Sequence, residues 1–272
     1  MQKPKNNFKV VSEKKARMIL PNAITLIGVC IGLSSIKFAL DGKFSLAVIA
    51  ILFAGLMDAL DGRIARLIKG TSRMGKELDS LGDVISFGVA PAFIMYFWSL
   101  QYLDKLGWFV CLIYVICVAL RLARFNINSE EEPSWKDNYF EGMPAPAGGI
   151  VVLMPLIISF SGFSGLSESF FKINYDLMVP IFFIIVSIFL ISTIPTYSFK
   201  KIVIPRSMTK FLLFGMVLFF GALLVYTFKI LTISILIYLC LIPVSYFHYK
   251  KIKKEKNFIT DVSENDDLED IL

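Results

Sequence analysis

Four aspartates of this sequence are spaced so that they could hold metal ions together. Asp58 and Asp61 are three residues apart, and Asp79 and Asp83 are four residues apart. On an α-helix, either spacing places the two side chains of a pair on the same face. Facing carboxylates repel one another unless cations lie between them, and oxygen ligands without His or Cys suit Mg²⁺, Mn²⁺ or Ca²⁺. The sequence therefore predicts a divalent-metal site between two helices.

Small and basic residues flank these aspartates. Gly62 and Gly75 lack side chains, which would let a nucleotide or phosphate group approach the helix backbone closely. Arg66, Lys69 and Arg73 could then contact phosphate oxygens. A structural alternative is an interfacial salt-bridge network between the acids and nearby basic residues, namely Arg63, Arg66, Arg73 and Lys76. Four acids at helical spacing around two glycines favour a functional site over that network.

The elements that must position these acids are membrane helices. The chain is 56% apolar, with a mean hydropathy of +0.68 and 18% charged residues, against about 25% charged in soluble domains. Two charge-free stretches, 44–57 and 106–120, reach spanning length only if helices continue through Asp58, Asp61 and Arg63 or through Arg121. Six others approach the ~20 residues of a membrane span: 18–36, 84–103, 143–167, 177–199, 211–228 and 230–249. We expect an all-α, polytopic membrane helical bundle of eight spans.

The distribution of basic residues predicts the orientation of these spans. With eight spans, 23 of the 28 Lys and Arg residues fall on one side, and the positive-inside rule places that side in the cytoplasm. Both termini and the aspartates would then face the cytoplasm. The expected organisation is a basic cytoplasmic arm over residues 1–17, one membrane domain over 18–249 and a charged, disordered cytoplasmic tail over 250–272.

The cysteines do not suggest disulfides or a zinc site. All four lie inside apolar stretches and show neither CxxC nor His-partnered spacing, namely Cys30, Cys111, Cys117 and Cys240. They are predicted to be small apolar core side chains. The first apolar stretch lacks a small-residue cleavage pattern, so we expect it to be retained as a span.

The aspartates belong to a longer pattern, Asp-x2-Asp-Gly-x2-Ala-Arg-x8-Gly-x3-Asp-x3-Asp. Its fixed positions are satisfied here by Asp58, Asp61, Gly62, Ala65, Arg66, Gly75, Asp79 and Asp83. The pattern resembles the signature of the CDP-alcohol phosphatidyltransferase family. Eight fixed positions over 26 residues in an apolar context make this resemblance specific.

The resemblance implies a role for each residue of the pattern. A pair of Mg²⁺ or Mn²⁺ ions, with Ca²⁺ as another occupant, would be held by Asp58, Asp61 and Asp79, with Asp83 as a further ligand. The pocket for a CDP-linked lipid would be lined by Gly62, Ala65, Arg66 and Gly75. Asp83 would also be the general base that takes the proton from the acceptor hydroxyl.

Other segments resemble one branch of the family, the integral-membrane phosphatidylserine synthases. They cover residues 20–25, 86–92, 121–126, 140–147 and 192–200. This resemblance implies CDP-diacylglycerol and L-serine as substrates, with phosphatidylserine and CMP as products. Arg121 and Arg124, three residues apart, could hold the serine carboxylate or a lipid phosphate. Snorkelling of both side chains to headgroups is the alternative.

Two other functions remain open on the sequence. One is the same chemistry with another acceptor, such as glycerol 3-phosphate, an inositol compound or choline. The other is a divalent-metal transporter, which would favour acids near the bilayer midplane and interrupted helices in both halves of the chain, whereas these acids gather in one half near one face. We further expect a homodimer in the bacterial cytoplasmic membrane, with membrane lipids and no nucleic acid as partners and the active site facing the cytoplasm.

Overall fold

The computed structural model describes residues 13–68, 70, 72–128, 139–162, 175–197 and 208–269. Its internal contacts group into two compact units, Met1–Leu122 and Ala123–Leu272. Within the described residues the elements are helices apart from one pair of short strands. The predicted all-α class is therefore confirmed, with a two-stranded addition that the sequence did not predict.

Five helices of the described residues are long and apolar enough to cross a membrane: Ile19–Leu40, Phe44–Leu67, Arg73–Trp98, Leu100–Ile127 and Thr227–Lys250. The second continues through Asp58, Asp61 and Arg63, and the fourth continues through Arg121. Both therefore reach spanning length in the way that the sequence analysis expected. At the other expected positions the described helices are shorter, among them Leu177–Ile191 and Thr209–Val225. The chain is a polytopic integral membrane protein, in which five of the eight expected spans have full length.

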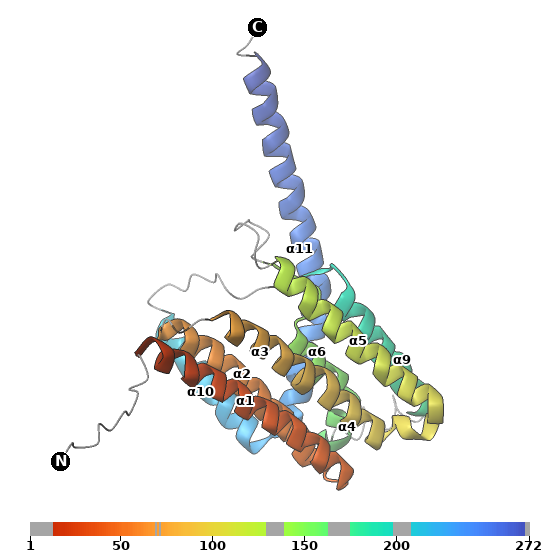
Figure 1. The fold of residues 1–272 in the computed structure, drawn as a ribbon. Helices are drawn as coiled ribbons and strands as arrows, with labels where there is room; N and C mark the ends of the chain where they lie inside the picture. Colours follow the sequence, from red (N-terminus) through yellow and green to blue (C-terminus); the bar gives the residue numbers. More distant parts are fainter. Residues whose placement is uncertain are drawn as a thin grey trace, which may run out of the picture. The chain divides into compact units, whose positions relative to one another are not determined.

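The first unit begins with α1 (Glu13–Leu40) and α2 (Phe44–Leu67), which lie side by side (Figure 1). Gly42, with φ +72°, ends α1 in a left-handed conformation that glycine adopts without strain. Its N–H donates to the carbonyl of Ala39 at 3.0 Å, and the N–H of Lys43 donates to that of Phe38 at 2.8 Å. These two bonds make a Schellman motif, and the tight turn makes α1 and α2 antiparallel neighbours.

The third membrane helix is continuous but not uniform. It consists of α3 (Arg73–Asp83), the π-helix η1 (Val84–Val89) and α4 (Ala90–Trp98). Ser72 caps the start of α3, because its hydroxyl accepts the N–H of Gly75 at 3.0 Å. The connection from α2 spans only residues 68–72, so α3 runs back beside α2 and brings their acidic residues to the same depth.

Two glycines of α1, four residues apart, let the other helices approach it closely. A Cβ atom on Gly28 would lie 3.3 Å from Cβ of Met57 on α2, and one on Gly32 would lie 2.7 Å from Oγ of Ser86 on η1. This small-xxx-small spacing is typical of tightly packed membrane helices. α1 therefore packs closely against both helices that carry the aspartates.

The short 3-10 helix η2 (Leu100–Leu103) leads into α5 (Asp104–Asn128), which begins in the first unit and ends in the second. Aromatic rings gather where α4 ends and α5 begins. The ring of Trp108 lies 5.7 Å from that of Phe93 and 5.4 Å from that of Tyr96, measured between centroids. Such clusters are typical of a membrane–water interface, and this one lies at the end of the third membrane helix opposite Asp79.

In the second unit, β1 (Tyr139–Glu141) pairs antiparallel with β2 (Pro195–Tyr197). Gly142 follows β1 with φ +74°. Its N–H donates to the carbonyl of Ile194 at 2.9 Å, and its own carbonyl accepts the hydroxyl of Thr196 at 2.7 Å. A Cβ atom here would lie 2.4 Å from the carbonyl oxygen of Ser192, so this position requires glycine.

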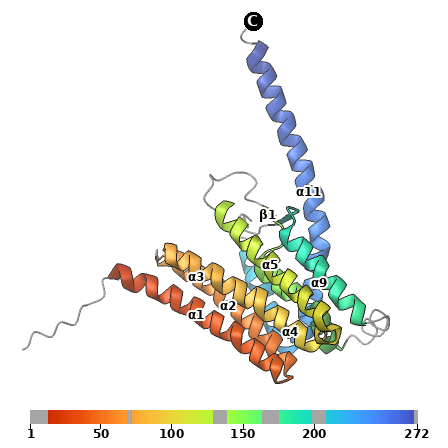
Figure 2. The same cartoon turned by 45° about the vertical axis from the view of Figure 1, so that its right-hand side comes forward.

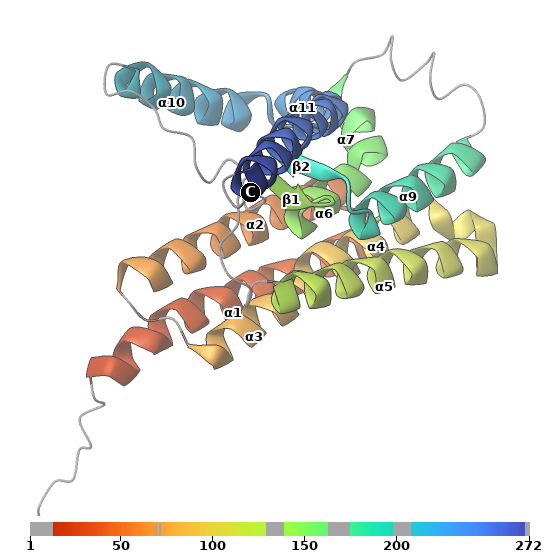
Figure 3. The same cartoon turned by 90° about the horizontal axis from the view of Figure 1, so that it is seen from above.

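The helices of the second unit are α6 (Ala145–Val152), α7 (Met154–Ser161), α9 (Tyr175–Ile191), α10 (Thr209–Val225) and α11 (Thr227–Glu269). α6 and α7 are separated at Leu153, where Pro155 lacks the N–H that the carbonyl of Val151 would need. Figure 2 shows the length of α11, which continues to Glu269 through the charged stretch where composition favoured a disordered tail. Figure 3 shows that α10 leads directly into α11. No residue of α10 is buried, which fits a helix whose side chains contact lipid. Of the four free cysteines, Cys111 and Cys117 are buried core side chains, as predicted, whereas Cys30 and Cys240 are exposed, so the prediction of a core position is wrong for these two.

Candidate functional site

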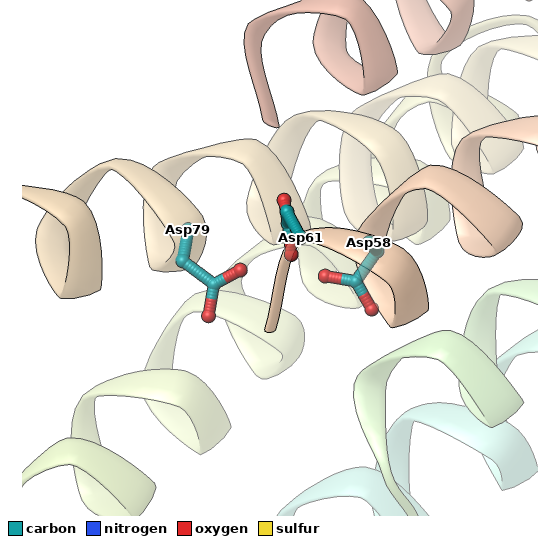
Figure 4. Close-up of side chains that lie close together, drawn as sticks. All are labelled: Asp58, Asp61 and Asp79. Carbon is teal, nitrogen blue, oxygen red and sulfur yellow. The ribbon is translucent and has the colours of Figure 1, made fainter. Parts of the chain in front are cut away.

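Three of the predicted metal ligands converge in the first unit. Carboxylate oxygens of Asp58, Asp61 and Asp79 all lie within 4.8 Å of one another. Asp58 and Asp61 come from α2 and Asp79 comes from α3 (Figure 4), where Asp58 and Asp79 extend toward each other with Asp61 between them in this view. The prediction that acids on two antiparallel helices share one site is confirmed for these three.

Asp83 lies beside the cluster. It lines the same pocket as Asp58, Asp61 and Asp79, and it is close enough to interact electrostatically with Asp58, Asp79 and Arg121. Ionised carboxyl groups so close together repel one another, and a cation between them removes that repulsion. The donor set, carboxylate oxygens alone, therefore fits a hard divalent cation such as Mg²⁺, Mn²⁺ or Ca²⁺.

Three of the four basic residues in the salt-bridge alternative do not pair with these acids. Within the residues that the structure describes, Arg63, Arg66 and Arg73 are exposed and form no ion pair with the four aspartates. Four carboxylates inside a membrane helix pair are costly unless cations offset their charge. The arrangement is thus one that binding of a cation would stabilise.

Thr25 of α1 is a site residue to which the sequence analysis gave no role. Its hydroxyl donates to Oδ2 of Asp61 at 2.6 Å, and it also lies 3.1 Å from the carbonyl of Pro21, one turn earlier. Asp61 is only 3% exposed, so this bond orients a buried carboxylate. The available signal was a hydroxyl in the first span near its basic end, where the aspartates of the second and third spans also lie.

The aspartates line a small pocket of about 10 Å³ whose walls come from α1, α2, α3 and η1. Thr25 and Ser86 contribute hydroxyl groups to it, and Phe87 contributes an apolar wall. Ser86 and Phe87 are buried residues of the π-helix. A pocket that combines four acids and two hydroxyls offers the oxygen ligands that a hard divalent cation prefers.

The other residues of the motif lie outside this pocket lining. On α2, Gly62 and Arg66 are exposed and Ala65 is half-buried, and a Cβ atom on Gly62 would meet nothing within 4 Å. Gly75, in the first turn of α3, has a packing reason of its own, because a Cβ there would lie 3.0 Å from Oδ1 of Asn22. Arg73 is exposed, and Lys69 lies outside the described residues.

The two arginines of α5 have different surroundings. Arg121 is buried, with 8% of its surface exposed, and acts electrostatically on Asp83. Arg124 donates from Nη1 to the carbonyl of Ile191 at 2.7 Å, at the end of α9. A cation bonded to the last carbonyls of a helix stabilises that end, so Arg124 has a structural partner in the second unit.

The sequence also matches known proteins. The model of the CDP-alcohol phosphatidyltransferase family matches residues 18–173. A CDP-diacylglycerol–serine O-phosphatidyltransferase of Mycobacterium leprae is 36% identical over 227 residues, which cover 83% of this chain and 73% of that protein. The protein of the same name from Helicobacter pylori is 33% identical over 184 residues, covering 68% and 74%. Since the family model covers more than half of the sequence and includes all four aspartates, this chain belongs to the CDP-alcohol phosphatidyltransferase family.

Proposed function

We propose that the chain transfers the phosphatidyl group of CDP-diacylglycerol to L-serine, which gives phosphatidylserine and CMP. The observation that carries the reaction is the convergence of Asp58, Asp61 and Asp79, with Asp83 beside them, in one pocket. Support for serine as the acceptor comes from relatives named for that substrate, among them the two described above, which match most of this chain.

In the proposed reaction the hydroxyl oxygen of serine attacks the phosphorus that carries diacylglycerol. The bond from that phosphorus to the bridging oxygen breaks, and the bridging oxygen leaves with CMP. Asp83 accepts the hydroxyl proton, because it lines the pocket but is not one of the three acids whose oxygens cluster most tightly. We propose direct attack without a phosphatidyl-enzyme intermediate.

The proposed cofactor is Mg²⁺ or Mn²⁺, as two ions held by Asp58, Asp61 and Asp79, with Asp83 as a further ligand. When bound, the cations would offset the negative charge of the pyrophosphate and of the departing CMP. The CDP moiety is proposed to meet α2 just after Asp61, at Gly62, Ala65 and Arg66. On α3 it is proposed to meet Gly75.

Arg121 is the residue that we propose to bind the carboxylate of the acceptor, serine. Serine is a zwitterion, so its site needs a cation for the carboxylate and an acid for the ammonium group. Arg121 offers a buried guanidinium near Asp83, and a planar guanidinium can hold a carboxylate through two hydrogen bonds. Arg124, which bonds to the end of α9, is the second candidate. The KM for serine, measured in Arg121→Ala and in Arg124→Ala, shows which of the two binds the carboxylate.

We propose the following membrane arrangement. The membrane domain covers residues 18–249 with eight spans, and the arm 1–17 and the tail 250–272 lie in the cytoplasm with the active site. The distribution of basic residues supports this orientation. The location is proposed to be the bacterial cytoplasmic membrane and the assembly a homodimer, as the family resemblance implies.

Fluorescence of a reporter fused after Leu272 tests the orientation, and light scattering in detergent tests the dimer.

The test of the proposed activity is CMP release by the purified protein in detergent. CDP-diacylglycerol and Mn²⁺ are supplied with serine, glycerol 3-phosphate, inositol or choline in separate reactions. CMP release that depends on serine, with phosphatidylserine recovered from the lipid fraction, is the expected result. Release with another alcohol would replace serine as the acceptor, and no release with any of them would overturn the proposal.

A matched pair of variants ties that activity to the acid cluster. Asp79→Asn removes a carboxylate that the structure places in the cluster, so activity should fall by about a thousandfold or more, as when an essential metal is lost. Asp41→Asn removes an exposed carboxylate that pairs with Lys37 at 2.6 Å, and it should leave activity unchanged. Equal losses in both variants would argue against a specific role for the cluster.

A further inference from the structure

The helix that carries Asp79 and Asp83 changes its hydrogen-bond pattern directly after Asp83. Residues Val84–Val89 form a π-helix, in which the N–H of Ala90 donates to the carbonyl of Ile85, five residues earlier. π-turns inside α-helices are uncommon and cost hydrogen-bond geometry, so each one needs a local cause. The pattern returns to an α-helix at Ala90.

Pro91 supplies that cause. It lies four residues after Phe87 and has no N–H, so it cannot donate the α-helical bond to the carbonyl of Phe87, and its ring crowds that carbonyl. The wider π-turn moves the carbonyl away from the proline. It also leaves that carbonyl in need of another donor, because Phe87 is 1% exposed and a buried carbonyl without a partner is costly.

The donor is Tyr114 of α5. Its hydroxyl donates to the carbonyl oxygen of Phe87 at 2.8 Å, and the tyrosine is fully buried. A side chain from a neighbouring membrane helix thus replaces the N–H that Pro91 lacks. In an apolar environment such a bond is hard to exchange for another partner, so it fixes the backbone at Phe87 relative to α5.

The backbone at Phe87 is in turn part of the pocket wall. The Phe87 side chain lines the pocket, and its ring lies against α2, where a Cβ atom on Gly55 would be 3.5 Å from Cε1 of the ring. Gly55 lies one helical turn before Asp58, and Phe87 lies one turn after Asp83. A shift of the π-turn would therefore change the position of Asp83 relative to Asp58.

We propose that Tyr114 is a positioning residue of the metal site: through the Phe87 carbonyl it holds the π-turn that sets Asp83 and the pocket wall against the acids of α2. Tyr114 is not among the residues that line the pocket. Its effect on turnover rests on the proposed function, whereas its effects on the π-turn and on cation binding do not.

Tyr114→Phe tests this with a minimal change, because it removes one hydroxyl and keeps the buried ring. We expect the dissociation constant for Mn²⁺, measured from the electron paramagnetic resonance signal of free Mn²⁺, to rise about fivefold or more, the size of one lost buried hydrogen bond. Amide hydrogen exchange in a peptide covering residues 84–92 of the metal-free protein should speed up by a similar factor. Tyr102→Phe, at a tyrosine that is 74% exposed, is the matched control and should change neither quantity.

A second variant separates this role from general packing. Pro91→Ala supplies an N–H four residues after Phe87, so the carbonyl gains a donor within its own helix. In a Pro91→Ala background, Tyr114→Phe should therefore change Mn²⁺ affinity by less than about twofold. Equal shifts with and without Pro91 would overturn the proposal, and so would unchanged affinity and exchange in Tyr114→Phe alone. If the wild-type protein releases no CMP, the proposed function fails, while these two measurements still decide the role of Tyr114.

Discussion

Replacing Gly62 by alanine should change stability and activity in opposite directions. Gly62 lies within α2, one residue after Asp61, and its position is exposed. A Cβ atom there would meet nothing within 4 Å. The added methyl group therefore has no steric cost in the protein without substrate, whereas it would enter the space where we propose that the CDP moiety approaches the helix.

The size of both effects can be worked out from the structure. Alanine is favoured over glycine inside a helix by up to about 1 kcal/mol. For a protein of this size class that corresponds to a rise in thermal midpoint of about 2–4 °C. Against the substrate, a methyl group in a filled space costs about 1–3 kcal/mol, so kcat/KM for CDP-diacylglycerol should fall by about 5- to 150-fold.

The assay compares two variants at glycines of the same kind. Gly215 of α10 is also exposed, also lies inside a helix and also has nothing within 4 Å of an added Cβ. Gly215→Ala should raise the thermal midpoint in detergent similarly and leave CMP release unchanged. If Gly62→Ala keeps kcat/KM within twofold of the wild-type value, the substrate does not approach the helix at this glycine. A fall in its thermal midpoint would contradict the open surroundings on which the reasoning depends.

Three further outcomes are expected. Gly32→Ala should lower the thermal midpoint by several degrees, because its Cβ would lie 2.7 Å from Oγ of Ser86 and overpacking costs about 1–3 kcal/mol; an unchanged midpoint would mean that α1 can shift without loss. Thr25→Val removes the donor 2.6 Å from Asp61, so the Mn²⁺ concentration for half-maximal activity should rise about fivefold, and an unaltered metal requirement would leave Thr25 with packing alone. Arg124→Ala removes a charged donor to the last carbonyl of α9, so stability should fall by about 1.5–3 kcal/mol, measured as the shift in thermal midpoint; a raised KM for serine at unchanged stability would show substrate contact instead.

The acid cluster could be predicted because its cause is local. The spacing of Asp58 and Asp61, and of Asp79 and Asp83, fixes a common helix face from the helical period alone. The short connection after α2 then makes the two helices antiparallel neighbours. Those two facts suffice to bring Asp58, Asp61 and Asp79 together, as the structure confirms.

The π-turn was not predicted, although its cause is visible in the sequence. Pro91 shows that one backbone bond inside the third membrane helix must be missing. A helix can respond with a kink, a bulge or a side-chain donor, and the choice depends on Tyr114, which lies 27 residues from Phe87 along the chain. That choice is a tertiary contact, so local pattern could not settle it.

The pair of β1 and β2 was missed for the same reason. Gly142 was noted only as part of a resembling segment, and its positive φ and its bond with Thr196 join positions 54 residues apart. Arg124 shows the converse difficulty. From the sequence it could hold substrate or snorkel to headgroups, and neither interpretation predicted that its Nη1 lies 2.7 Å from the carbonyl of Ile191.

The family motif lies wholly on α2 and α3, yet these two helices do not complete the site. Thr25 of α1 orients Asp61, the most buried of the four acids. Thr25 reaches it only because Gly28 and Gly32 let α1 approach α2 and η1 without intervening side chains. Since a carboxylate inside a membrane helix needs a partner, we expect the small residues of α1 to be required for the proposed metal site. A chain with an intact motif and bulky residues at these two positions should therefore fold its membrane helices but bind divalent cations weakly.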